Sequence, residues 1–448
     1  MSSDPACGLL LLADARSVED AGARARLSQP EKHSARPDRH EMQRSEADIQ
    51  TWEYLASPAG RELVCQVEAC GDPAGLTPSA LASLRELADA DTVRRAVELV
   101  RARQKAARKI AGAASLFADV EGVEQASGTV AAAWKARRYA DRGVDRVVDL
   151  CSGIGGDLIE LRRALPDADV RGIDRDPVRA WMASRNAACE TEVQDVTSLD
   201  LDGAAFHVDP ARRVEGEGRR LRNVEDYMPG RPFLERLVGS GRSGALKLGP
   251  GAELRDLPGA ERGEVEILGG AEGLLQAVVW CGSLAREPGS RTATRVDRAT
   301  SFSGSPTRLP VTSEVGSHLL VAEPALERAD LVAARAPEGL MALPAGDGWA
   351  TADGALSDPW FRSFEVLEVL PWRERRLRAA LRALDAGIVH VKVRGRIADA
   401  NVTERALRGD GGATVWLFGY RAGERAVAVL ARALAHGEGL GEDGSEER

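Results

Sequence analysis

The chain has 448 residues and a formal net charge of −9, and 44% of its residues are hydrophobic and 29% charged. A chain of this length can bury two or three hydrophobic cores, and its acidic balance argues against strong non-specific affinity for nucleic acid. No apolar stretch approaches the length of about 18 residues that a membrane helix needs, so we expect no membrane span.

The amino-terminal stretch 1–45 is rich in Ser, Pro, Arg, Glu and Asp without a sustained period, so we expect it to be disordered. Met42 is a second candidate for the first translated residue. The apolar patch from Leu9 to Leu12 lacks the basic flank and the length of a secretory signal, which favours a cytoplasmic location. The six cysteines form no C-x-x-C pair and have no histidines at metal-ligand spacing. They predict reduced thiols and no metal site.

Residues 46–140 read as a helical domain. Apolar side chains recur there at three- to four-residue steps, for example from Trp52 to Leu55, which is the period of an amphipathic helix. The stretch 94–109 carries seven Lys and Arg side chains against Glu98 alone. This composition indicates a positive helix face, which either binds an anionic partner or keeps an ordinary helix in solution.

A β-branched run ends at Asp149 and is followed by a glycine-rich turn that opens a helix. Gly153, Gly155 and Gly156 allow the backbone to turn sharply and to lie against a ligand, which is typical of a nucleotide-cofactor loop in an open α/β sheet. The dinucleotide pattern G-x-G-x-x-G is absent, because its third glycine would fall at Leu158. A pyrophosphate cofactor is therefore disfavoured, and a structural turn without a ligand stays open as the alternative.

Two further acids follow predicted strands. Asp174 ends the second strand, 21 residues after Gly153 in the sequence, where a carboxylate accepts both hydroxyls of an adenosine ribose in such sheets. Asp195 follows a short third strand and is a candidate for accepting from an adenine amine. The alternative for Asp195 is a local turn or the N-cap of a following turn.

The fourth predicted strand is an apolar run that stops at Asp209 and Pro210. Because proline cannot continue a strand ladder, Asp209 is expected at the carboxyl edge of the sheet, where ligands bind. Arg212 and Arg213 come directly after this edge. Their guanidinium groups suit phosphate, but a solvated pair of arginines is an equally good interpretation.

The remaining elements complete an α/β domain over residues 141–285. The run 244–249 predicts a fifth strand, and the runs 265–268 and 276–280 are expected to pair as an antiparallel edge. Residues 286–310 are rich in Arg, Ser, Thr and Gly and are predicted to be a linker or flexible loop.

Residues 311–435 are predicted to form a separate α/β module, followed by a disordered tail over 436–448. In the run 387–395 the valines point to one face of a strand, whereas His390, Lys392 and Arg394 point to the other. This cationic row either follows a phosphate backbone or is a charged sheet face that discourages aggregation.

These motifs, in this order, resemble the bacterial class I S-adenosylmethionine-dependent methyltransferases that carry a THUMP-like carboxyl-terminal domain. The resemblance covers about residues 46–435. It implies a Rossmann-like sheet between a helical amino-terminal domain and an α/β THUMP-like domain that presents RNA. It also implies that S-adenosylmethionine binds at Asp149, Cys151, Gly153, Gly155, Gly156, Asp174 and Asp195.

In the same family the acceptor faces an Asp/Asn-Pro-Pro-aromatic motif, which corresponds here to Asp209 and the Pro210 carbonyl. This sequence departs from that motif, because Ala211 replaces the second proline and no aromatic residue follows. The resemblance implies a methyltransferase acting on a base nitrogen of transfer or ribosomal RNA. Lys392, Arg394, Arg212 and Arg213 are the candidate RNA contacts.

Two other functions stay open at this point. An RNA-binding or assembly protein with a vestigial cofactor site is favoured by the altered catalytic motif. A nicotinamide-dependent oxidoreductase is disfavoured by the missing third glycine.

Overall fold

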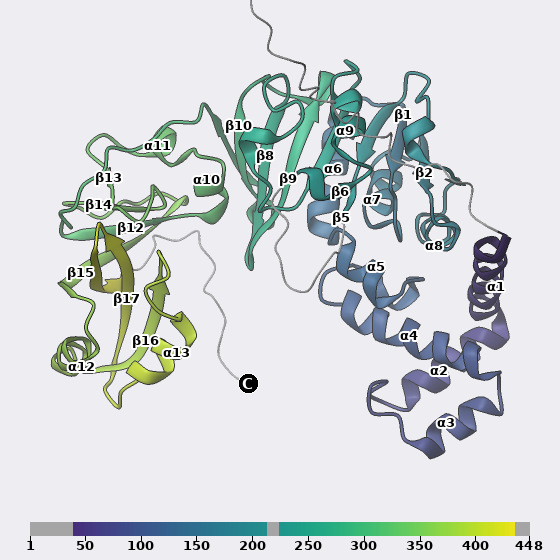
Figure 1. The fold of residues 1–448 in the computed structure, drawn as a ribbon, viewed down its shortest axis with the longest axis horizontal. Coiled ribbons are helices and arrows are strands. Elements are labelled where there is room, and N and C mark those ends of the chain that lie inside the picture. The colour runs from purple at the N-terminus through teal and green to yellow at the C-terminus, as the bar shows by residue number, and fades with distance from the viewer. Residues whose placement is uncertain (1–38, 213–223, 435–448) are drawn as a thin grey trace, which may run out of the picture. The chain divides into compact units, whose positions relative to one another are not determined.

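The structure is a computed structural model that describes residues 39–212 and 224–434 (Figure 1). The described residues from Ala47 onward belong to one compact unit. Most of the expected disordered extension, the predicted contact Arg213 and the predicted tail 436–448 lie outside the described residues. The expectation for 1–45 is wrong at its end, because the first helix already begins at Arg39. Glu41, Met42, Gln43 and Arg44 all favour helix over coil, which the low hydrophobicity of the segment concealed.

The amino-terminal region is helical. Its helices are α1 (Arg39–Ala56), α2 (Pro58–Ala69), α3 (Pro78–Arg85), α4 (Ala90–Ala106), α5 (Val120–Gln125) and α6 (Thr129–Asp141). The sequence sets their starts: Ser57 and Thr77 accept from the backbone N–H three residues on, and a proline follows each cap. Trp52 and Leu55 pack in a core shared with α2 and α4.

The positive face predicted over residues 94–109 is partly neutralised. Lys105 pairs with Glu124 of α5, and Arg95 pairs with Asp48 of α1. The sequence count missed these acids because they come from other helices. The positive charge of this face is therefore smaller than the composition of residues 94–109 suggested.

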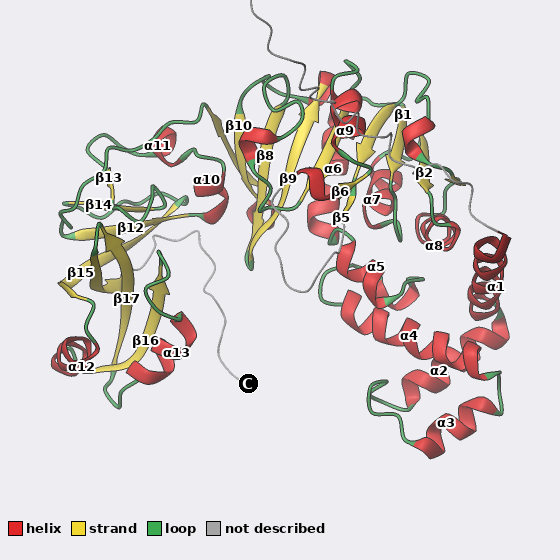
Figure 2. Ribbon diagram, viewed as in Figure 1, coloured by secondary structure: helices red, strands yellow, loops and turns green. Residues whose placement is uncertain are grey.

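A nine-stranded mixed sheet follows, seen as the larger group of yellow strands in Figure 2. The order of its strands is β11-β10-β8-β9-β7-β4-β1-β2-β3. The elements are β1 (Arg146–Leu150), α7 (Gly156–Ala164), β2 (Asp169–Asp174), α8 (Pro177–Ala187), β3 (Thr191–Val193), β4 (Ala205–Val208), α9 (Arg231–Val238), β7 (Gly244–Leu248), β8 (Glu264–Gly270), β9 (Gly273–Cys281), β10 (Arg291–Arg295) and β11 (Thr300–Gly304). A short two-stranded sheet pairs β5 (Ala211–Arg212) with β6 (Tyr227–Met228).

The two faces of the nine-stranded sheet have separate cores. Apolar side chains of α6 and α7 cover one face and meet Val147, Ala205 and Ala245. Helix α9 covers the other face and meets Phe206 and Leu246. Because side chains alternate along a strand, the residue after each apolar one belongs to the opposite face.

The five parallel strands and the β8–β9 pair occur where the sequence predicted them. The predictions of a β8–β9 edge and of a linker over 286–310 are both wrong. Strand β10 pairs in parallel with β8, and β11 pairs antiparallel with β10, so these strands extend the sheet. The inward residues of β10 are threonines, Thr292 and Thr294, which donate to buried Glu264 and Glu266. This polar but buried pattern looks like a linker in the sequence.

The carboxyl-terminal part has a seven-stranded sheet with the order β13-β14-β12-β15-β18-β17-β16. Its elements are β12 (His318–Ala322), α10 (Pro324–Arg328), α11 (Val332–Arg335), β13 (Met341–Ala342), β14 (Trp349–Ala352), β15 (Phe361–Pro371), α12 (Glu374–Ala383), β16 (Ala386–Val393), α13 (Ala400–Leu407), β17 (Ala413–Ala422) and β18 (Arg425–Ala433). The expected separation from the preceding domain is not seen. Leu320 and Leu326 share a core with Phe206 and Leu246 of the nine-stranded sheet.

None of the helices in residues 39–212 and 224–434 combines the length and the apolar composition required to cross a bilayer.

Candidate active site

Four polar side chains project from one face of the nine-stranded sheet, at the carboxyl ends of its central strands. Asp149 of β1 lies opposite His207 of β4 in the strand register. Continuing the register of β4 and β7 places Asp209 beside Lys247, two residues closer to the edge. All four face α6 and α7, because their neighbours along each strand belong to the core beneath α9. The edge that the sequence predicted as a ligand site therefore carries a compact row of charges.

Asp149 is almost completely buried, with 1% of its surface exposed. Its Oδ1 lies 2.7 Å from His207 Nδ1. Its Oδ2 has no hydrogen-bond partner among the described residues. Burial raises the pKa of Asp149, and the neighbouring His207 only partly opposes that effect. A buried carboxylate oxygen without a donor costs free energy, so this atom fits a cationic ligand group such as the ammonium of a methionyl chain.

The loop after β1 has an unusual backbone. Cys151 has a φ of 61°, in the left-handed region that favours glycine, and Gly153 and Gly155 are also left-handed. A Cβ at Gly153 would meet nothing within 4 Å, so this glycine leaves open space beside the loop. A non-glycine residue in the left-handed region is typical of functional loops, where surrounding structure holds the strain.

Gly155 and Gly156 lie closer to other parts of the protein than Gly153 does. A Cβ at Gly155 would lie 3.1 Å from Ala183 Cα, and one at Gly156 would lie 3.0 Å from Ala126 Cβ. Both glycines therefore allow other parts of the protein to pack against the loop. Of the three, only Gly153 has the open surroundings expected for a ligand contact.

Asp174 lies at the end of β2, next to the glycine loop. Its Oδ2 accepts from the backbone N–H of Gly153 at 2.8 Å, and its Oδ1 accepts from that of Asp176 at 2.9 Å. Burial raises its pKa, while these two bonds act in the opposite direction. Each carboxylate oxygen can accept a second bond. Asp174 thus holds the loop and keeps acceptor capacity for ribose hydroxyls.

Asp195 caps the short 3-10 helix Val196–Ser198. Its Oδ1 accepts from the backbone N–H of Thr197 at 2.8 Å and from the hydroxyl of the same residue at 2.7 Å. This is the capping geometry that the sequence left as the alternative to adenine binding. The residue is exposed beyond the end of β3.

Asp209 directly follows β4. Its backbone N–H donates to the carbonyl of Leu150 at 3.2 Å, which fixes the residue at the sheet edge. Its Oδ2 lies 2.5 Å from Lys247 Nζ, and 28% of its side chain is exposed, whereas Pro210 is buried. The arrangement is a carboxylate held by a lysine and still accessible from outside.

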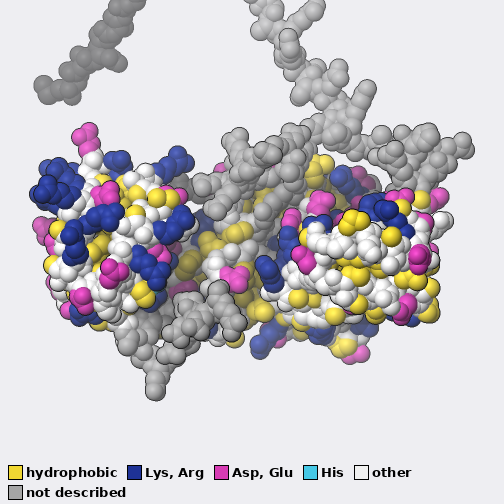
Figure 3. Space-filling model, turned by 90° about the horizontal axis from the view of Figure 1, so that it is seen from below, with side chains coloured by type: hydrophobic (Ala, Val, Ile, Leu, Met, Phe, Trp, Pro, Cys, Tyr) yellow, Lys and Arg dark blue, Asp and Glu magenta, His cyan; other side chains and the backbone are white. Residues whose placement is uncertain are grey.

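The residues that the sequence suggests as RNA contacts lie in different surroundings. Arg394 forms a two-point ion pair with Glu327, at 2.6 and 2.7 Å, and lies 4.7 Å from the centre of the Trp349 ring. Arg394 therefore links the end of β16 to α10, whereas Lys392 of the predicted cationic row is exposed and His390 is half-buried. Arg212 lies in β5. Seen from below, Lys and Arg side chains of the carboxyl-terminal part are mixed with Asp and Glu side chains (Figure 3, left).

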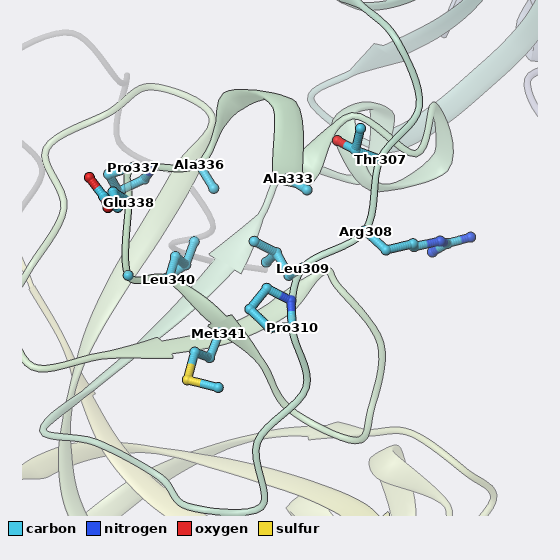
Figure 4. Close-up of a pocket in the computed structure, with 11 residues that line it drawn as sticks. Thr307, Arg308, Leu309, Pro310, Ala333, Ala336, Pro337, Glu338, Leu340 and Met341 are labelled. Carbon is cyan, nitrogen blue, oxygen red and sulfur yellow. The ribbon is translucent and has the colours of Figure 1, made fainter.

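A separate hollow of about 470 Å³ lies in the carboxyl-terminal part. Figure 4 shows its lining from residues 307–310 and 333–341, with Leu309, Leu340 and Met341 among the labelled side chains and Arg308 directed away. None of the residues predicted for the cofactor or the acceptor lines it. We therefore assign no part of the active site to this hollow.

The thiols of the described residues are expected to differ strongly in reactivity. Burial raises the pKa of Cys281 to about 12 and that of Cys189 to about 11, and it also raises that of Cys151 well above its ordinary value. Cys65 and Cys70 are exposed. The thiolate is the form that reacts with iodoacetamide. At pH 8 we therefore expect Cys65 and Cys70 to be labelled at least about ten-fold faster than the three thiols with raised pKa values. Peptide mass spectrometry over a time course measures this, and equally rapid labelling of Cys151 would reveal an activated thiol.

Sequence reasoning did not identify four side chains that surround this site: His207, Lys247, Asp157 and Lys135. The sequence did contain a signal for two of them. A central strand with helices on both faces is usually apolar on both sides, so a polar residue inside such a strand is unusual. His207 and Lys247 interrupt such strands, so each must have a buried partner. Lys135 and Asp157 lie on helices, where a single charge carries no such signal.

Comparison with known proteins identifies the cofactor. Two Mycobacterium tuberculosis proteins, from strains CDC 1551 and H37Rv, are each named as uncharacterised S-adenosylmethionine-dependent methyltransferases. Each is 34% identical to this chain over 302 residues, which is 65% of the chain and 81% of the relative. The chain belongs to the S-adenosylmethionine-dependent methyltransferases. A nicotinamide-dependent oxidoreductase is thereby ruled out.

The fold and the carboxyl-terminal domain of this methyltransferase also have known counterparts. The crystal structure of a protein from Porphyromonas gingivalis W83 that is named as a methyltransferase superposes with a TM-score of 0.63 at 18% identity, covering 84% of this chain and 99% of that one. Residues 361–433 match the family described as THUMP domain-like. The methyltransferase therefore has a THUMP-like carboxyl-terminal domain, as the resemblance implied.

Proposed function

We propose that this methyltransferase modifies a base nitrogen of structured RNA, of the transfer or ribosomal class. The observation that carries the proposal is the THUMP domain-like match over residues 361–433, in the same chain as the S-adenosylmethionine site. The methyl acceptor would lie at the sheet edge that carries Asp209 and Lys247. Lys392, Arg212 and Arg213 are the proposed phosphate contacts, and Arg394 is no longer among them.

The residues present fit S-adenosylmethionine. The cofactor supplies a methyl group on a sulfonium and carries an ammonium but no phosphate. Asp149, through its unpartnered Oδ2, would hold the ammonium directly or through a water, and the open backbone at Gly153 would lie against the methionyl chain. Asp174 would accept hydrogen bonds from the ribose hydroxyls. Asp195 would accept a hydrogen bond from the adenine amine through its second oxygen, Oδ2.

Asp209 would face the acceptor nitrogen together with the Pro210 carbonyl. A hydrogen bond from the acceptor amine to Asp209 limits delocalisation of the nitrogen lone pair, and the carboxylate can take the proton that leaves the nitrogen after transfer. The methyl transfer is direct, so alignment and the exclusion of water supply most of the acceleration, without a covalent enzyme intermediate. Lys247 keeps the Asp209 carboxylate oriented at the edge.

The proposal is tested by comparing modified nucleosides, by mass spectrometry, between wild-type cells and cells that lack the gene. RNA purified from the deletion cells is then the acceptor for tritium from labelled S-adenosylmethionine. We expect one methylated nucleoside to be missing from the deletion cells and to be restored by the purified enzyme.

Replacement of Asp209 by alanine should lower tritium incorporation at least about 100-fold, because it removes the group that handles the proton. Binding of S-adenosylmethionine should persist, since Asp209 lies on the acceptor side. Asp200→Ala is the matched control, because that aspartate is 87% exposed and lies on the surface. Unchanged incorporation by Asp209→Ala contradicts the catalytic assignment.

Two outcomes would redirect the proposal. A complete set of RNA nucleosides in the deletion cells, with label entering protein or small molecules, would move the activity to another acceptor. Cofactor binding without transfer to any fraction would favour an RNA-binding or assembly protein with a vestigial site. The altered motif after Pro210 is the feature on which that alternative rests.

A further inference from the structure

The helical leader, residues 117–135, lies directly against the cofactor loop. The Asn186 side chain bonds to the backbone N–H and carbonyl of Phe117 at 2.8 and 2.9 Å, and it also donates to the Ile154 carbonyl at 2.8 Å. Asp119 pairs with Arg179 of α8 at 2.6 Å. The leader therefore forms the wall of the loop on the side where Gly156 leaves room for it.

A buried charged junction lies behind this wall. Lys135 of α6 is 1% exposed, and its Nζ lies 2.7 Å from Asp157 Oδ1 in the first turn of α7. Ser127 Oγ donates to Asp157 Oδ2 at 2.7 Å, and Gln276 Nε2 donates to Ser127 Oγ at 2.8 Å. Three parts of the chain, the leader, the start of α7 and β9, are thus linked through the Ser127 hydroxyl.

The junction also reaches the row of charges beneath the cofactor loop. His207 Nε2 lies 3.8 Å from Asp157 Oδ2, while its Nδ1 contacts Asp149. Burial acts to raise the pKa of Asp157, but the charges of Lys135, His207 and Lys247 outweigh it and hold the pKa well below its ordinary range. Burial lowers the pKa of Lys135, which the 2.7 Å contact with Asp157 opposes, so each group of the pair favours the charged form of the other.

Stability alone does not account for this pair. A buried ion pair is often no more stabilising than apolar side chains of the same volume, because both charges lose their hydration. Helix α7, however, begins at Gly156, and its N-cap residue Gly155 provides no side-chain cap. Its first turn follows the glycine loop directly, and Asp157 anchors that turn through polar contacts to Lys135 and Ser127.

We propose that Lys135 is a positioning residue for the cofactor: through Asp157 it fixes the first turn of α7 and the glycine loop in the binding conformation. Docking of the leader and binding of S-adenosylmethionine then stabilise each other, because coupling between two binding events is reciprocal. The leader is on this account part of the cofactor site. The inference concerns only the cofactor, so it holds whatever the methyl acceptor is.

The test compares three variants of the full chain by calorimetric titration with S-adenosylmethionine and with S-adenosylhomocysteine. Lys135→Met removes the charge and leaves Asp157 unpaired. The double variant Lys135→Met/Asp157→Leu replaces the pair by apolar side chains, which restores stability without restoring the charged contact. Lys105→Met is the control, because Lys105 of α4 also pairs with an acid of the leader, Glu124, but both side chains of that pair are exposed, at 44% and 55%.

We expect Lys135→Met to unfold at a lower temperature, because it leaves a buried carboxylate unpaired. We expect the double variant to unfold near the wild-type temperature and yet, like Lys135→Met, to bind both compounds about ten-fold more weakly or worse, in the usual range of coupling between sites. We also expect S-adenosylmethionine to slow hydrogen exchange over residues 117–135 in the wild type and in Lys105→Met but not in the double variant. Wild-type affinity in the double variant, or no slowing of exchange in the wild type, would overturn the proposal. A failure of RNA methylation with intact coupling would contradict the proposed acceptor and leave this inference standing.

Discussion

Replacing Arg138 by alanine is expected to lower the free energy of unfolding by about 3–5 kcal/mol, the usual cost of removing one partner of a buried ion pair. The Arg138 guanidinium donates to Glu264 at 2.6 Å and to Glu266 at 2.9 Å, and both glutamates are completely buried on β8. It also lies 4.1 Å from the centre of the Trp280 ring. The variant leaves two buried carboxylates without their cation, although hydroxyl and indole donors remain.

Urea denaturation followed by circular dichroism measures this loss. Arg138→Lys should fall between the wild type and the alanine variant, because it keeps the charge but cannot reach both carboxylates with a planar fork. Arg137→Ala is the control, since Arg137 is the next residue of α6 and its side chain is 72% exposed. A loss at Arg138 no larger than that at Arg137 would show that the buried glutamates do not depend on this arginine.

Replacing Asp174 by alanine is expected to weaken S-adenosylmethionine binding by about 100-fold or more. The substitution removes an acceptor for two ribose hydroxyls, and hydrogen bonds to a charged group contribute about 1.5–3 kcal/mol each. It also removes the bond that ties the Gly153 backbone to β2. At 100 times its wild-type dissociation constant the cofactor should stabilise the wild type by about 2.7 kcal/mol and the variant by about 0.4 kcal/mol or less.

Asp176→Ala separates this effect from a general loss of structure. Asp176 caps α8 by accepting from the backbone N–H of Val178 at 2.8 Å, so its loss should cost about 1 kcal/mol of stability. Its carboxylate bonds the α8 backbone and is not part of the proposed ribose site. An affinity in Asp174→Ala equal to that in Asp176→Ala would mean that Asp174 does not hold the ribose.

Local patterns in the sequence predicted the part of the fold that positions the cofactor. The β2 bounds Asp169–Asp174 agree with the prediction, because an apolar run and a terminal acid are local signals. Strands β10 and β11 could not be found in this way. Thr292 and Thr294 of β10 are polar and buried because they donate to Glu264 and Glu266 on β8, and among the described strands β11 pairs only with β10.

The same limit applies to the site. Asp149, Asp174 and Asp209 stand at strand ends that the sequence marks, and the structure brings all three to one sheet edge. The roles of Gly156 and Arg394 depended on distant neighbours, Ala126 and Glu327, which no local pattern reveals. The sequence therefore predicted most of the secondary structure around the site but not the contacts between residues that are distant in the chain.

The most direct test of the whole account is a crystal structure of the enzyme with S-adenosylhomocysteine. We predict that the methionyl ammonium lies at Asp149 Oδ2 and that the ribose hydroxyls lie at Asp174, with the sulfur directed toward Asp209. A nucleoside bound elsewhere on the protein, or both carboxylates without contact to it, would contradict the assignment of this sheet edge as the active site.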